Sequence, residues 1–126
     1  MATITPKIKK LIEENALALA TVDGLGNPHC IVVGYPKVVS KNQIVISNIY
    51  MVDTVKNIQK NNNVVLTVWN REWKNDEICV GYELKGKAEM VSSGKWKKFA
   101  DSLDENKGYK LKGAILVAVN KIKKLV

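Results

Sequence analysis

The chain has 126 residues, of which 46% are hydrophobic and 25% are charged. This length fits a single domain and excludes an enzyme whose active site lies between two lobes, and the hydrophobic content excludes disorder as the main state. The net charge is +8, and 19 of the 20 basic residues are lysines, 11 of them within residues 85–126. Because specific readers of nucleic acids favour the planar guanidinium of arginine, this charge predicts a diffuse attraction to anions rather than sequence recognition.

Three short helices are predicted along the chain. Thr5 followed by Pro6 is typical of a helix start, and the apolar residues behind it predict a helix that ends near Asn15. A second helix is expected to begin near Asp53 or Thr54 and to end in an asparagine run at residues 61–63. The third is expected to be capped by residues 92–93. Its apolar stripe consists of Trp96, Phe99, Ala100 and Leu103.

Six strands are predicted between turn residues. They are expected at residues 16–22, 28–35, 43–48, 64–69, 78–91 and 113–120. The second is followed by an extended run to residue 39 beyond Pro36, and the fifth is expected to be broken or bulged at Gly81 and Gly86. Turn signals separate neighbouring strands, and strand–helix–strand units are few. The pattern therefore favours a small closed antiparallel barrel over a parallel sheet.

Two observations bear on the compartment. No run approaches the roughly 18 apolar residues of a membrane span, and the polar and charged first ten residues do not resemble a signal peptide. Cys30 and Cys79 are isolated, and we favour reduced thiols over a disulfide. We therefore expect a cytoplasmic protein.

The usual catalytic patterns are missing from the sequence. There is one histidine, His29, for which we favour a structural role over that of a general base. We also find no glycine-rich phosphate loop and no metal-ligand spacing. A chain with so little chemistry of its own can take it from a bound cofactor.

The segment from Ser47 to Thr54 is the best candidate for a binding site. It runs from a predicted strand end into a predicted helix start, where unpaired backbone N–H groups and the helix dipole attract an anion, above all a phosphate. Ser47, Asn48 and Thr54 add short side-chain donors. The alternative is that Asp53 or Thr54 only caps the helix.

The basic last third leaves a second function open, a non-enzymatic barrel that binds single-stranded nucleic acid. Such a site needs exposed aromatic rings among its lysines, and Trp96 and Phe99 belong to a predicted helix stripe. We therefore do not expect nucleic acid to be the partner. The lysines at 95, 97 and 98 mark either an anionic partner or a solvated face, and we favour the latter. For Trp69 and Trp73 we favour core packing over contact with a planar ligand or a second subunit.

In their order, these features resemble the pyridoxamine 5'-phosphate oxidase-like FMN-binding split barrels. The resemblance runs from about Lys7 to Val119 and is carried by the leading helix and by the stretches 16–23, 26–29, 44–63 and 84–89, the last being similar to the family's G-x-A strand. It implies a mainly β fold over residues 1–126, a six-stranded antiparallel split barrel with three short flanking helices. It also implies a homodimer with FMN in a groove at the dimer interface.

The resemblance further implies which residues hold the cofactor. The flavin ring lies along the second strand and the phosphate lies against the strand end and the helix start. The implied set is Val32, Val33, Gly34, Ser47, Asn48, Met51, Val52, Asp53, Thr54 and Lys56. The true oxidases carry basic residues on the second strand and an Arg-Lys pair at the helix start, which this chain lacks. We therefore expect Lys56, or a lysine of the partner subunit, to neutralise the phosphate.

The chain resembles the short FMN-binding proteins of this superfamily more closely than the true oxidases, which continue beyond the last strand. The resemblance implies a flavin-dependent oxidoreductase or electron carrier with no catalytic side chain assigned, and oxidation of pyridoxamine phosphate itself is not expected. Some relatives bind a deazaflavin or haem in place of FMN.

Overall fold

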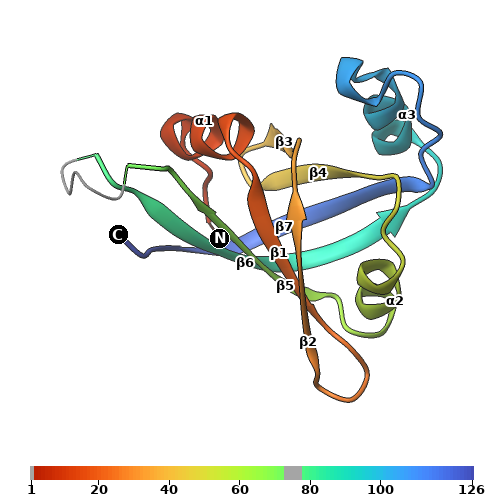
Figure 1. Cartoon of the computed structure of the whole chain (residues 1–126), viewed down its shortest axis with the longest axis horizontal. Coiled ribbons are helices and arrows are strands. Elements are labelled where there is room, and N and C mark those ends of the chain that lie inside the picture. The colour runs from red at the N-terminus through yellow and green to blue at the C-terminus, as the bar shows by residue number, and fades with distance from the viewer. Residues whose placement is uncertain (1, 73–77) are drawn as a thin grey trace.

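The computed structural model describes residues 2–72 and 78–126. Within them the chain forms a seven-stranded antiparallel sheet, three α-helices and a short 3-10 helix (Figure 1). The elements are α1 (Pro6–Glu14), β1 (Leu17–Val22), β2 (Pro28–Val33), β3 (Lys37–Ser40), β4 (Gln43–Asn48), α2 (Asp53–Lys60), β5 (Asn63–Trp69), β6 (Gly81–Val91), α3 (Lys95–Ser102), η1 (Asp104–Asn106) and β7 (Gly113–Lys124). The predicted mainly β fold with three flanking helices is confirmed, with seven strands in place of six.

The additional strand arises at Pro36. The extended run predicted over residues 28–39 is divided into β2 and β3, which lie at opposite edges of the hydrogen-bonded order β2-β1-β5-β6-β7-β4-β3. Proline has no N–H to donate to a ladder, so the chain leaves one edge before this residue and joins the other edge after it. The closed barrel that the strand pattern favoured is therefore wrong, whereas the split barrel that the family resemblance implied is confirmed, with β2 and β3 on the two sides of the split.

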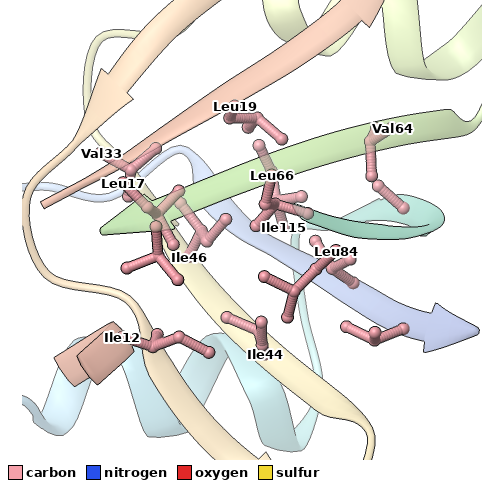
Figure 2. Packing of buried hydrophobic residues seen from close by; sticks show 14 of the residues in the cluster. Ile12, Leu17, Leu19, Val33, Ile44, Ile46, Val64, Leu66, Leu84 and Ile115 are labelled. Carbon is pink, nitrogen blue, oxygen red and sulfur yellow. The ribbon is translucent and has the colours of Figure 1, made fainter. Parts of the chain in front are cut away.

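The core fills the inside of the barrel. Leu19, Leu66 and Leu84 lie in register on the neighbouring strands β1, β5 and β6, and all three are fully buried (Figure 2). Ile12 of α1 closes the same cluster from outside the sheet. Burying one such side chain stabilises the fold by about 1.5–3 kcal/mol. Because the interior is packed with side chains, a ligand site has to lie outside it or at the split.

The start of α1 is as predicted. The backbone N–H of Ile8 donates to Thr5 Oγ1 at 3.3 Å, and Pro6 follows this N-cap residue. The helix ends at Glu14, and Asn15 Nδ2 donates to the carbonyl of Leu11 at 2.9 Å. Both ends of α1 therefore follow from local capping chemistry.

Helix α3 covers the outer face of the sheet at β4 and β7 (Figure 1). Ala100 packs against Val45 and Ala114, and the rings of Trp96 and Phe99 meet edge to face with their centroids 6.1 Å apart. Packing of the predicted apolar stripe is confirmed for these residues of α3. Two of the three aromatic residues in the basic third are therefore engaged in packing.

The N-cap residue of α3 is not the predicted one, and two lysines of the helix have side-chain partners. Gly94, and not residues 92–93, occupies the N-cap position, with a φ of 90° that favours glycine. Lys95 Nζ lies 4.5 Å from the centroid of the Trp96 ring, and Lys97 pairs with Asp101 at 2.6 Å. These two lysines thus have partners within their own helix.

The long strand β6 bends where its pairing with β7 shifts, between Lys85 and Gly86. A Cβ atom on Gly86 would overlap the carbonyl of Ala118 on β7, so only glycine allows this approach. The predicted irregularity at Gly86 is confirmed. At Gly81 the strand begins, so residues 78–80, predicted to belong to it, are not part of β6.

Two further observations concern the whole described chain. Cys30 is exposed and Cys79 is buried, and both are free thiols, as expected. None of the helices within residues 2–72 and 78–126 is long and apolar enough to cross a bilayer.

Candidate functional site

A cleft of about 520 Å³ opens between the edge strand β2 and the connection from β4 to α2. Small-molecule sites in proteins commonly have volumes of about 300–1,000 Å³. The cleft is lined by His29, Ile31, Val32, Val33, Gly34, Tyr35, Ser47, Ile49, Tyr50, Met51, Val52, Asp53, Thr54 and Asn106. It therefore lies at the split side of the barrel, where the sheet has an edge.

The structure brings most of the predicted site residues to this cleft. Eight of the ten line it: Val32, Val33, Gly34, Ser47, Met51, Val52, Asp53 and Thr54. The other two, Asn48 and Lys56, do not. The two segments that the family resemblance assigns to the ring and to the phosphate thus form the walls of one cavity.

The buried side chain of Asn48 binds the backbone of the segment that connects β4 to α2. Its side chain is 1% exposed, and its Oδ1 accepts a hydrogen bond of 2.8 Å from the backbone N–H of Met51. Its Nδ2 donates to the carbonyl of Met51 at 3.4 Å. The amide therefore holds the connection that precedes α2 and is not among the residues that line the cleft.

Lys56 lies outside the cleft. It is exposed and lines a smaller neighbouring hollow together with Lys112. The structure therefore does not place this ammonium group among the residues that line the cleft.

The first turn of α2 presents its N–H groups without a side-chain cap. Val52 occupies the N-cap position, and its side chain cannot accept a hydrogen bond. The alternative that Asp53 or Thr54 holds this position is therefore wrong. The N–H groups in the first turn of a helix have no acceptor within the helix, and the helix dipole adds partial positive charge. An anion in the cleft can be bound here, although the exposed carboxylate of Asp53 opposes it.

Asn106 lines the cleft from a segment that the sequence analysis did not connect with the site. It lies in η1 and is only 7% exposed, and its Nδ2 donates to Ser47 Oγ at 2.7 Å and to the carbonyl of Ala100 at 2.8 Å. Its local sequence, Asp-Glu-Asn, is typical of a solvated turn, so nothing nearby could have identified it. Its place in the site depends on η1 and α3 folding back onto β4.

The wall formed by β2 is apolar and its rim is exposed. Ile31 and Val33 lie on the side of β2 that faces the core cluster, whereas Val32 is 76% exposed and Tyr50, across the cleft, is 79% exposed. His29 also lines this wall, and the preference for a structural role over that of a general base stays a prediction. An apolar wall beside exposed aromatic rings suits a flat, largely apolar ligand.

Trp69, at the end of β5, is not among the residues that line the cleft. Trp69 ends β5 and is partly exposed. Trp73 lies outside the described residues. The sequence-based preference for core packing is therefore not met by Trp69 and stays a prediction for Trp73.

The fold and the position of the cleft define a split barrel with a ligand-sized site at its open side. Residues 4–123 match the sequence profile of the pyridoxamine 5'-phosphate oxidase family. The chain belongs to this family. It is also 29% identical over 123 residues to the uncharacterized protein MJ0282 of Methanocaldococcus jannaschii, which covers 94% of this chain and 78% of that protein.

Solved structures share the fold at lower identity. HupZ of Group A Streptococcus superimposes with a TM-score of 0.86 at 23% identity, covering 97% of this chain and 94% of its own. An FMN-binding protein of Syntrophomonas wolfei superimposes with a TM-score of 0.75 at 20% sequence identity, and the match covers 94% of this chain and 83% of that protein's chain. The heme storage protein HutZ of Vibrio cholerae superimposes with a TM-score of 0.64 at 19% sequence identity, and the match covers 98% of this chain and 94% of the HutZ chain. An F420 reductase superimposes with a TM-score of 0.65 at 19% sequence identity, and the match covers 94% of this chain and 98% of that chain.

Proposed function

We propose that the chain binds FMN in the cleft and acts as a flavin-dependent oxidoreductase or electron carrier. One observation carries the proposal: the uncapped first turn of α2, the Ser47 hydroxyl and the apolar wall of β2 border the same cavity of about 520 Å³. Membership of the pyridoxamine 5'-phosphate oxidase family and the similarity to an FMN-binding protein support it.

The lining residues fit the two ends of FMN. At one end, backbone N–H groups of the first turn of α2 and the hydroxyl groups of Ser47 and Thr54 are donors suited to a phosphate. At the other end, Ile31 and Val33 form an apolar wall for the ring. Bound FMN supplies hydride or electron transfer, and the protein binds, orients and partly desolvates it. We assign no acid, base or substrate, and we do not propose oxidation of pyridoxamine phosphate.

A second copy of the chain is part of the proposal. On the outer face of the sheet, small side chains lie in register across β2, β1 and β5. One row consists of Val32, Ala18 and Thr67, and a second row consists of Cys30, Ala20 and Val65. Helix α3 covers the outer face at β4 and β7, on the other half of the sheet. Val32 belongs both to this face and to the cleft rim. A partner subunit on this face would therefore also border the ligand.

The test of FMN binding is direct. The protein is purified, its visible spectrum is recorded, and any released chromophore is identified by mass. We expect a yellow protein that releases FMN, or an apoprotein that quenches FMN fluorescence on titration. Riboflavin, which lacks the phosphate, is the matched control and should bind more weakly. A colourless protein that leaves FMN fluorescence unchanged would contradict the proposal.

A haem-binding function is the second candidate, and the position of His29 favours it. The only histidine of the sequence lines the cleft, and imidazole is a common axial ligand of haem iron. A relative in fold is described as a heme storage protein. A Soret band in the purified protein that is lost in His29→Ala would support haem over FMN. Release of a deazaflavin would instead indicate a cofactor like that of the F420 reductase.

A further inference from the structure

Asn106 reaches the cleft from a distant part of the chain. The other lining residues fall between His29 and Thr54, whereas Asn106 belongs to η1, beyond β6 and α3. Its side chain is buried, and its amide contacts Ser47 on β4. A buried polar side chain at such a place is held by specific hydrogen bonds, since burial without partners costs free energy.

The orientation of the Asn106 amide is determined by its partners. The carbonyl of Ala100 can only accept a hydrogen bond, so the atom that lies 2.8 Å from it has to be the amide nitrogen. That nitrogen has two protons. One goes to Ala100 and the other to Ser47 Oγ at 2.7 Å. Ser47 therefore acts as the acceptor in its contact with Asn106.

This arrangement leaves the proton of the Ser47 hydroxyl for a ligand. The hydroxyl borders the cleft, and no acceptor for its proton is present among the residues that the structure describes. Without Asn106, the hydroxyl could turn and use either its proton or its lone pairs toward the cleft. With Asn106 donating to it, Ser47 is held as a donor, which suits an anionic oxygen.

We infer that Asn106 is a positioning residue that holds the Ser47 hydroxyl as a hydrogen-bond donor to the phosphate of the bound cofactor. The inference rests on the proposed binding of FMN. Ser47 borders the same cleft as the first turn of α2, whose N–H groups favour the same kind of ligand. Asn106 itself acts through Ser47 and is not assigned a contact with the ring or with a substrate.

The test compares FMN with riboflavin in a double-mutant cycle. Ser47→Ala and Asn106→Ala should each weaken FMN binding about 10- to 100-fold, as expected for one hydrogen bond to a charged group, and leave riboflavin binding nearly unchanged. The double variant should lose no more than Ser47→Ala alone, because Asn106 acts only through the Ser47 hydroxyl. The ³¹P resonance of bound FMN should move in both variants. Ser47→Thr, which keeps the hydroxyl, should retain most of the affinity.

Loss of folding is controlled separately. Asn106→Ala also removes the contact with Ala100 at the end of α3, whereas Ser47→Ala leaves that contact in place. Ser102→Ala is the matched control, because it removes a hydrogen bond to Phe99 in the same region without touching the cleft. Its FMN affinity should equal that of the natural chain.

The outcomes separate the inference from the proposed function. If the natural chain binds FMN but Ser47→Ala does not weaken it, or Asn106→Ala weakens FMN and riboflavin equally, Asn106 has only a structural role and the inference is wrong. Additive losses in the double variant would also overturn it. If the natural chain binds no FMN at all, the proposed function fails and the inference fails with it.

Discussion

Asn57 of α2 donates a hydrogen bond of 3.0 Å from its Nδ2 to Oγ1 of Thr21 on β1, and both side chains are buried. Ile58, the next residue of α2, packs into the barrel core. A directional bond next to an apolar contact determines how α2 lies against the sheet. Because the first turn of the same helix lines the cleft, the pair links the core to the candidate site.

Removal of this pair should destabilise the fold. Asn57→Ala leaves the buried Thr21 hydroxyl without its donor, and we expect the free energy of unfolding to fall by about 1–3 kcal/mol. The double variant Thr21→Val with Asn57→Leu should recover part of this loss, since no polar group is then left unpaired. The midpoint and slope of urea denaturation measure both effects. Gln59→Ala, an exposed change on the same helix, is the control, and an equal loss there would contradict the prediction.

Asp53 should weaken binding of an anion while stabilising its helix. Its carboxylate lies in the first turn of α2 and borders the cleft, close to where a phosphate would be bound. We expect Asp53→Asn to bind FMN about 2- to 5-fold more tightly at low salt, and the gain should shrink as salt is added. The same change should lower the free energy of unfolding by about 0.3–1 kcal/mol, because it removes a favourable charge at the helix N-terminus.

Fluorescence titration at two salt concentrations measures the affinity of Asp53→Asn. Glu89→Gln removes one negative charge at an exposed position that does not line the cleft, and it serves as the control for net charge. Equal gains in the two variants would show that only the net charge of the protein matters.

A charge at Val32 should break the proposed dimer. Val32 is largely exposed and lies on the face of small side chains formed with Ala18 and Thr67. We expect Val32→Glu to be a monomer in light scattering after size exclusion and to bind FMN more weakly. Leu25→Glu is the control, because Leu25 is an exposed apolar residue in the β1–β2 turn. A natural chain that is itself monomeric at all concentrations would contradict the prediction.

The β1–β2 turn should contribute stability that depends on pH. The pKa of Asp23 is lowered by the backbone N–H and side-chain amide of Asn27 and by the backbone N–H of Leu25. A carboxylate with a lowered pKa stabilises the folded state at pH above its ordinary value of 3.8, and this contribution is lost as pH falls through the lower folded value. The Tm of Asp23→Asn should therefore lie below that of the natural chain at neutral pH.

Thermal unfolding between neutral pH and strong acid tests this sign. The difference in Tm between the natural chain and Asp23→Asn should close as the solution is made acidic. Asp104→Asn changes an exposed carboxylate outside the turn and controls for net charge. A difference that is the same at both ends of the pH range would mean that ionisation of Asp23 is not involved.

Much of the fold and of the cleft was predictable because it depends on neighbours in the sequence. The capping of α1 by Thr5 follows from short-range chemistry, and α2 begins at Asp53 as predicted although no side chain caps it. The cleft walls are two continuous segments, one on β2 and one from Ser47 to Thr54. A strand end that runs directly into a helix start brings its donors together whatever the rest of the chain does.

The sequence by itself thus determined the order of the elements, the family resemblance and eight lining residues. Only the tertiary structure decided that the split lies between β2 and β3, that the Asn48 amide binds the connection before α2, that Lys56 is not among the cleft residues, and that Asn106 supports Ser47. Each of these depends on contacts between segments far apart in the chain. Residue type and spacing constrain local conformation, but the direction of a polar side chain is decided by the partners that packing brings to it.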